Sequence, residues 1–134
     1  LDVAGRAIGM ILELKVEGIG NEACAIVKRT GFPGPLIYAS FLMPELRRVR
    51  HTDPDAKIMV LQHRRLPPDP VADVVALDAS HVGLHFSTVT PMLLQTYHNL
   101  GRQVFVYTVN EPQDIQRMRN LGVDGIISDF PDRI

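Results

Sequence analysis

Short, nearly continuous apolar runs alternate along the chain with segments whose apolar residues are spaced three and four apart. The short runs are rich in β-branched residues and are bounded by glycine, proline or charged positions, a pattern typical of strands. Because apolar residues occupy consecutive positions in these runs, we expect strands that are covered on both faces, as in a parallel sheet. The six predicted strands span residues 10–15, 35–41, 57–61, 73–77, 103–109 and 124–128.

The segments between the predicted strands carry helix start and stop signals. Three of them begin at a residue suited to cap a helix N-terminus and end at glycine, the residue most common just beyond a helix C-terminus. We also predict a helix over residues 44–51 and a loop over residues 63–70, which contain three prolines. The three pairs of capping residue and terminating glycine are Asn21 and Gly31, Thr90 and Gly101, and Asn110 and Gly122.

Strands that alternate with helices leave two main architectures, an open doubly wound sheet or a closed barrel. The turn after Lys15 reads Val-Glu-Gly-Ile-Gly and lacks the glycine spacing of a nucleotide-binding loop, which favours the barrel. A complete barrel takes about 250 residues. We therefore predict an α/β fold of the TIM (β/α)₈ barrel type, in which this 134-residue chain forms a single domain holding only the last six βα units.

Composition narrows the possible partners. The chain has 14 basic and 15 acidic side chains and a formal net charge of −1, so we expect no nucleic-acid partner. No apolar run reaches the roughly 18 residues that span a bilayer, so we predict no transmembrane segment. The single cysteine, Cys24, excludes an internal disulfide, and its apolar neighbours predict a buried packing residue. The chain begins at Leu1, which indicates processing or a piece of a longer protein and leaves the compartment open.

In a barrel, the reacting groups project from the carboxyl ends of the strands. The first predicted strand ends in Glu13-Leu14-Lys15, and residues two apart on a strand share a face. If Leu12 and Leu14 pack against the helices, Glu13 and Lys15 point together toward the barrel axis. Such a pair could ligate a hard cation and hold a phosphate oxygen, or it could be a plain structural ion pair. The other polar strand ends are Ser40, Gln62, Asp78, Thr108, Asn110 and Asp129.

Weaker candidates lie elsewhere in the sequence. His81 and His85 are four apart and could share a helix face as zinc ligands do, but Gly83 lies between them and no Glu-x-x partner accompanies them. Asp124 is expected to shape the turn into the last strand, and Asp129 to cap the turn that follows it. A basic patch is expected to be a solvated surface, with an anionic headgroup or a protein partner as the alternatives. It comprises Arg47, Arg48, Arg50, Arg64 and Arg65.

Three segments of the sequence resemble the carboxyl-terminal part of the glycerophosphodiester phosphodiesterase family. Residues 11–15, Ile-Leu-Glu-Leu-Lys, are similar to the Glu-x-Lys strand of that family, and Ser40-Phe41 is similar to its Ser-Phe strand end. Most specific are Tyr-Thr-Val-Asn at residues 107–110 and Gly-Val-Asp-Gly-Ile-Ile-Ser-Asp-Phe-Pro at residues 122–131. The resemblance covers nearly the whole chain, although its middle third matches only in pattern.

The resemblance implies a barrel enzyme that uses one divalent cation, Mg²⁺ or Ca²⁺, to hydrolyse glycerophosphodiesters to an alcohol and glycerol 3-phosphate. By this likeness Glu13 would be a metal ligand and Lys15 a contact to the substrate phosphate. Phe41 and Tyr107 would form apolar walls around the glycerol. Tyr107 stands where the family usually has tryptophan, which leaves the preferred headgroup open.

The residues that carry acid–base catalysis in this family are missing from the sequence. No His-Arg-Gly motif occurs, and the nearest string, His63-Arg64-Arg65, follows the wrong strand. No catalytic residue is therefore assigned, and we expect this chain alone to be inactive. The alternative is a non-catalytic partial barrel that serves as a binding or assembly module and self-associates through its open sheet edges. Another phosphate-binding barrel enzyme is a third possibility.

Overall fold

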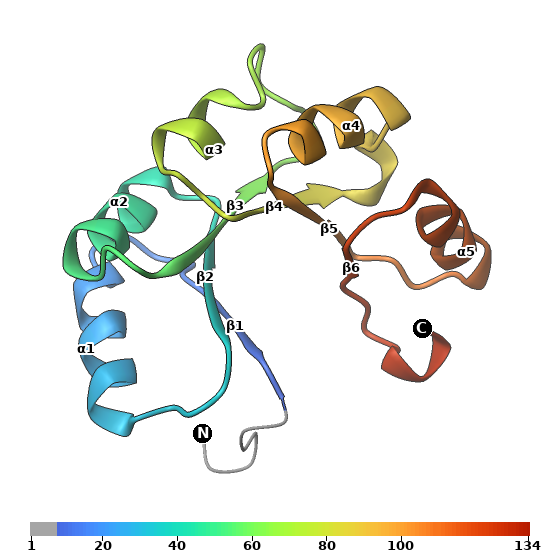
Figure 1. The fold of residues 1–134 in the computed structure, drawn as a ribbon. Helices are drawn as coiled ribbons and strands as arrows, with labels where there is room; N and C mark the ends of the chain where they lie inside the picture. The colour runs from blue at the N-terminus through green and yellow to red at the C-terminus, as the bar shows by residue number, and fades with distance from the viewer. Residues whose placement is uncertain (1–7) are drawn as a thin grey trace.

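A computed structural model describes residues 8–134 and shows six parallel strands that pair in the order in which they occur along the chain (Figure 1). The strands form an arc, and the helices cover its outer, convex side. A doubly wound sheet would reverse the strand order at a switch point, whereas sequential order is that of a TIM barrel. The predicted partial TIM barrel is thus confirmed. The strands are β1 (Met10–Glu13), β2 (Leu36–Ser40), β3 (Lys57–Gln62), β4 (His81–His85), β5 (Gln103–Tyr107) and β6 (Gly125–Ile126).

The predicted helices form, with small shifts at their starts. Gly31 and Gly122 end their helices in the left-handed conformation, with φ of 61° and 84°, and the Thr90 side chain accepts a hydrogen bond from Leu93 N at 3.1 Å. Asn21 and Asn110 do not cap, because the helices there begin after Ile19 and Glu111. The helices are α1 (Gly20–Thr30), α2 (Met43–Thr52), α3 (Ala72–Ala76), α4 (Pro91–Asn99) and α5 (Pro112–Leu121), with 3₁₀ turns at Phe86–Thr88 and Pro131–Arg133.

One predicted strand is wrong. Residues 73–77 belong largely to helix α3, and the strand of this unit is β4. Val74 and Leu77, three apart, both pack into the core, and a five-residue apolar run does not by itself distinguish a helix from a strand. The carboxyl end of this strand is therefore His85. Asp78, predicted as that strand end, lies before β4, in the turn at the amino end of the strand.

Side chains alternate between two faces of the sheet. Those on the convex face pack against the helices and form the main core, which includes Leu12 and Leu14 of the first unit. The concave face carries a smaller apolar cluster around Met59 and Leu61. Gly83 makes room for this cluster, since a Cβ atom there would lie 2.5 Å from Leu61 Cδ2. The polar side chains at the ends of the strands on the concave face thus remain available for a ligand site.

The structure also tests the expectations drawn from composition. Cys24 is buried in the main core, as predicted, and burial raises the pKa of its thiol. Within residues 8–134, no helix is both long and apolar enough to cross a membrane. In the same part of the chain, β1 pairs only with β2 and β6 only with β5, so each has one edge without a neighbouring strand.

Candidate functional site at the carboxyl ends of the strands

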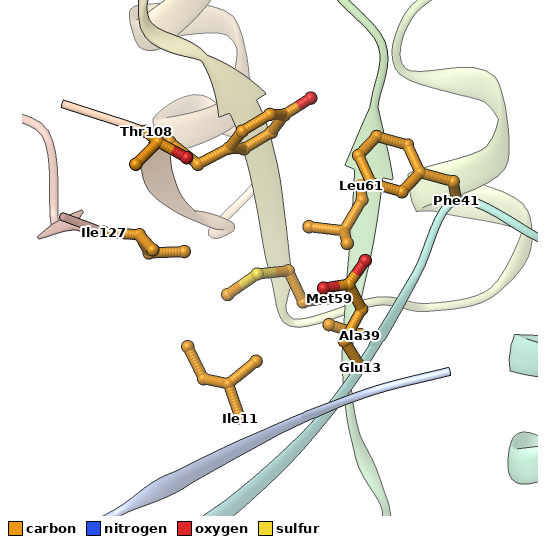
Figure 2. Close-up of a pocket in the computed structure, with 9 residues that line it drawn as sticks. Ile11, Glu13, Ala39, Phe41, Met59, Leu61, Thr108 and Ile127 are labelled. Atoms are coloured by element: carbon orange, nitrogen blue, oxygen red, sulfur yellow. The ribbon is translucent and has the colours of Figure 1, made fainter. Parts of the chain in front are cut away.

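A cavity of about 290 Å³ lies on the concave face near the carboxyl ends of the strands. Figure 2 shows the Glu13 carboxylate in the space that Phe41, Leu61 and Met59 surround. Glu13 is the only charged residue among those that line this cavity. The cavity can therefore hold an apolar group while presenting one carboxylate to it. Its lining residues are Ile11, Glu13, Ala39, Phe41, Met59, Leu61, Tyr107, Thr108 and Ile127.

Glu13 and Lys15 form the ion pair that their spacing predicts, with 3.5 Å between Glu13 Oε2 and Lys15 Nζ. Leu14 between them is buried in the main core, so its two neighbours project to the other side. The two side chains are 35% and 74% exposed, and an exposed pair of this kind contributes only about 0–1 kcal/mol to stability. Both groups thus keep most of their capacity to bind a ligand.

The backbone that carries this pair is held by Ser40. The buried Ser40 hydroxyl donates a hydrogen bond to Leu14 O at 2.6 Å and accepts one from Leu42 N at 2.9 Å. Leu14 N in turn donates to Ala39 O at 2.8 Å. Ser40, predicted as a polar strand end, therefore fixes the orientation of the backbone between Glu13 and Lys15.

A second anchor of this segment, Glu45 of α2, was not found from the sequence. Its side chain is 1% exposed, and its two carboxylate oxygens accept hydrogen bonds from Gly18 N and Gly20 N, each at 2.8 Å. Arg48 Nε lies 3.4 Å from the same carboxylate. The hydrogen bond from Gly18, helped by that from Gly20 and by the charge of Arg48, holds the pKa of Glu45 below its ordinary value despite burial. An ionised Glu45 thus fixes the loop that follows Lys15.

Phe41 and Tyr107 form two aromatic walls of the cavity, with ring centroids 5.9 Å apart and planes at 90°. The Tyr107 hydroxyl donates a hydrogen bond to Gln62 O and is therefore engaged by the backbone of β3. Burial, together with the negative charge of Glu13, raises the pKa of Tyr107 and keeps the phenol neutral. The predicted residues Glu13, Phe41 and Tyr107 thus line one cavity, with Lys15 beside it.

Two histidines extend this aromatic group. His63 stacks on Phe41 with centroids 4.5 Å apart, and His85 meets the Tyr107 ring edge to face at 5.9 Å. Burial, and then the charge of Arg64, lower the pKa of His85, whose Nδ1 accepts a hydrogen bond from Ser87 N at 3.2 Å. The spacing of His81 and His85 suggested a helix face, but both lie on strand β4. We call Glu13, Lys15, Phe41, His63, His85 and Tyr107 the carboxyl-end rim.

Two of the remaining polar strand ends, Asn110 and Asp129, bind each other. Asn110 ties the ends of β5 and β6 together, since its side chain donates to Asp129 Oδ2 at 2.9 Å and accepts from Asp129 N at 3.0 Å. The expected capping by Asp129 is wrong, because no side chain caps the 3₁₀ turn that follows. Asp124 accepts a hydrogen bond from Val104 N at 2.7 Å at the start of β5, in keeping with a structural role.

The described residues supply only part of a metal site. Mg²⁺ and Ca²⁺ take about six or more oxygen ligands, of which Glu13 can provide one carboxylate. No group of three or more His, Cys, Asp or Glu residues that could hold a metal ion occurs in residues 8–134. The residues present therefore do not make a complete cation site by themselves.

Fold and site together define the class: a partial TIM barrel with an acidic and a cationic group beside an apolar cavity at the carboxyl ends of its strands. Residues 10–133 match the glycerophosphoryl diester phosphodiesterase family, and the chain belongs to this family. The predicted family assignment is thereby confirmed.

Known relatives agree with this assignment. The chain is 29% identical over 117 residues to the glycerophosphodiester phosphodiesterase of Caldanaerobacter subterraneus subsp. tengcongensis, which covers 87% of this chain and 48% of that protein. A structure from Silicibacter pomeroyi, assigned to the same enzyme class, is similar with a TM-score of 0.84 and 32% identity over 95% of this chain and 48% of its own.

A phosphodiesterase from Oleispira antarctica, solved with sn-glycerol 3-phosphate, has the same fold with a TM-score of 0.82 and 24% identity. The match covers 95% of this chain and 53% of that protein. The chain spans about half the length of the curated relatives that it matches.

Proposed function

We propose that this chain forms part of the active site of an enzyme that hydrolyses glycerophosphodiesters to an alcohol and glycerol 3-phosphate. The observation that carries the proposal is the Glu13–Lys15 pair beside the cavity between Phe41 and Tyr107, in a chain of this family. A diester of this kind needs a site for an anionic phosphate next to a site for a small organic group. The rim offers a cationic group, Lys15, beside an apolar cavity that could take the organic group.

The proposed roles follow from the chemistry of each side chain. The Lys15 ammonium, 74% exposed, is free to contact a phosphate oxygen of the substrate. The Glu13 carboxylate would contribute one ligand to a divalent cation, Mg²⁺ or Ca²⁺, which when bound would stabilise the charge on the phosphoryl group. The rings of Phe41 and Tyr107 would hold the glycerol between them.

We propose that the activity requires groups beyond those described in this chain. Glu13 is a single carboxylate, so the other cation ligands have to come from elsewhere. The sequence also lacks the His-Arg-Gly motif expected to carry acid–base catalysis. We therefore expect this chain alone to bind glycerol 3-phosphate weakly and to show no turnover.

The proposal is tested by titrating the isotopically labelled chain with sn-glycerol 3-phosphate in the presence of Mg²⁺ or Ca²⁺ and following its NMR spectrum. We expect shifts at residues that line the cavity and weaker binding for Glu13→Gln and Lys15→Met. Glu22→Gln and Lys28→Met, on the exposed surface of α1, are matched controls and should bind as the parent chain does. Unchanged binding in the Glu13 and Lys15 variants would remove both residues from the site.

A second candidate function is assembly through the sheet edges. The outer edges of β1 and β6 have no neighbouring strand among the described residues, and such edges present backbone groups to another chain. We expect the isolated chain to self-associate at micromolar concentration, measured by light scattering after size-exclusion chromatography. A stable monomer under these conditions would exclude the assembly role.

A further inference from the structure

His63 and Arg64 directly follow β3, and His85 ends β4. The proposed reaction assigns a role to none of these three residues. We propose that His63, Arg64 and His85 bind a second anionic group of the ligand, beyond the group held between Phe41 and Tyr107. This inference rests on the proposed function for the position of the phosphate. It assigns the substrate class as diesters that carry an additional carboxylate or phosphate.

The loop that carries His63 and Arg64 is anchored at both ends. At one end, Gln62 O accepts the hydrogen bond from the Tyr107 hydroxyl. At the other, Pro70 O accepts a hydrogen bond from the Gln62 side-chain amide and lies 2.8 Å from the Tyr97 hydroxyl. Tyr97 is fully buried, and burial raises its pKa to about 12, so it remains a donor at neutral pH. The segment is thus held against the sheet next to the cavity.

Aromatic contacts connect this loop to the cavity. The His63 ring lies nearly parallel to the Phe41 ring, with 25° between the planes, and the Phe41 ring in turn meets the Tyr107 ring edge to face. His85 approaches Tyr107 from the neighbouring strand, with 87° between the planes. Phe41 and Tyr107 line the cavity, so each of the two histidines contacts one of its aromatic walls.

The charge near these histidines is positive and is not neutralised by a carboxylate. In residues 8–134, Arg64 and Arg65 make no ion pair, whereas Arg47, Arg48, Arg102 and Arg117 each pair with an acidic side chain. Arg64 follows His63 directly in the chain, and its charge adds to the effect of burial in lowering the pKa of His85. A guanidinium without an acidic partner, one residue from a histidine that stacks on a wall of the cavity, favours an anionic ligand group.

Aromatic rings around a small cavity could instead hold a quaternary ammonium group. The charges argue against this alternative. The one carboxylate that lines the cavity, Glu13, is paired with Lys15, and Arg64 would repel a second cation. Asp69 belongs to the same loop, but its carboxylate accepts a hydrogen bond from Val71 N at 3.1 Å at the far end of it.

The positions along the rim indicate where the second anion would sit. In the proposed function, the substrate phosphate lies at Glu13 and Lys15, and the adjoining organic group lies between Phe41 and Tyr107. The second anionic group would lie beyond that organic group, at His63 and Arg64. A carboxylate on the glycerol or on the other alcohol of the diester would satisfy the same chemistry. These two sources are separated by the choice of ligand.

The test compares two matched ligand pairs by NMR titration of the labelled chain at constant Mg²⁺, with the His63 and His85 ring signals as the readout. The first pair is sn-glycerol 3-phosphate and 3-phosphoglycerate, which differ by a carboxylate on the glycerol carbon chain. The second is glycerophosphoethanolamine and glycerophosphoserine, which differ by a carboxylate on the headgroup. We expect the carboxylate ligand of one pair to bind about fivefold more tightly, the upper end for an exposed charge pair.

Variants assign the preference to Arg64. Arg64→Gln should abolish the difference within the pair, while Arg29→Gln, at the exposed end of α1, should leave it unchanged. Equal binding within both pairs, or a preference that survives Arg64→Gln, would overturn the inference while the proposed function stands. Tighter binding of glycerophosphocholine than of glycerophosphoserine would show the aromatic cage instead. Failure of every ligand to bind would refute the proposed function and this inference with it.

Discussion

The two ends of the parallel sheet use their polar side chains in different ways. At the amino end, Arg50 reaches from α2 to four backbone carbonyls, those of Pro54, Ala56, Leu77 and Asp78, at 2.6–3.2 Å. At the carboxyl end, Glu13 and Lys15 pair only with each other among residues 8–134 and remain accessible. The Arg50 guanidinium at the amino end is thus engaged by the protein, whereas Glu13 and Lys15 at the carboxyl end are available to a ligand.

The same contrast holds at the other strands. His98 and Asp124 form a 2.8 Å contact beside the start of β5, and Arg102 pairs with Asp78 at 2.8 Å before β4. On the opposite side, Arg64 has no acidic partner among the ion pairs of residues 8–134. Mutation of Arg50 should therefore change mainly stability, and mutation of Glu13, Lys15 or Arg64 should change mainly binding.

The largest effect on stability is expected for Arg50→Ala. This change removes the hydrogen bonds to four carbonyls and leaves two loops without their common donor, so the free energy of unfolding should fall by about 3 kcal/mol. Urea denaturation followed by circular dichroism measures it. Arg47→Ala is the control, because Arg47 is exposed and makes one long ion pair with Asp73, and its effect should stay below about 0.5 kcal/mol. Equal effects of the two changes would contradict the role of Arg50.

Glu45→Gln should cost about 2 kcal/mol at neutral pH, because a charged acceptor of two backbone N–H groups is replaced by a neutral amide. The lowered pKa means that the ionised form is favoured in the folded state. This contribution is complete above the ordinary pKa of 4.5 and is lost as the pH falls through the lower folded-state pKa. The difference in unfolding free energy between the two proteins should therefore shrink in acid. A difference that stays constant from pH 7 to pH 2 would contradict the stabilising role of the ionised Glu45 carboxylate.

Tyr107→Phe should lower the free energy of unfolding by about 1 kcal/mol, the usual contribution of one hydrogen bond, since Gln62 O loses its donor. The ring that lines the cavity remains, so binding of sn-glycerol 3-phosphate should persist. Tyr107→Leu removes the aromatic wall and should weaken binding. If the phenylalanine variant loses binding as completely as the leucine variant, the hydroxyl contacts the ligand and not only Gln62.

The smallest effect on stability is expected for Glu13→Gln. Its exposed pair with Lys15 contributes little, so the free energy of unfolding should change by less than about 0.5 kcal/mol. Cation-dependent ligand binding should nevertheless be lost. Denaturation and calorimetric titration of the same sample separate the two effects. A loss of stability comparable to that of Arg50→Ala would place Glu13 with the structural groups and remove the contrast between the two ends.

The parts of the site that could be predicted from the sequence are those set by local periodicity. Glu13 and Lys15 share a face because strand side chains alternate, and Leu14 between them is apolar. Phe41 and Tyr107 were placed by family likeness. In each case the inference needed only a short window of sequence.

The parts that could not be predicted depend on contacts between distant segments. Glu45 binds Gly18, 27 positions earlier, and nothing in its own helix distinguishes it from an ordinary first-turn acid. His85 was considered only for a helix face shared with His81, because the run at 73–77, which is largely helical, was predicted as the strand and put the strand end at Asp78. His63 gains its place by stacking on a residue from the neighbouring strand.

Gly83 affects which ligands could fit the cavity at the carboxyl ends of the strands. It faces the interior behind Leu61, and Leu61 in turn lines the cavity. A single methyl group added at Gly83 would force the Leu61 side chain to shift, and so change the shape of the cavity that Leu61 lines. The capacity of the cavity is therefore set one layer beneath its surface, and it can be resized without altering any residue that a bound molecule would touch.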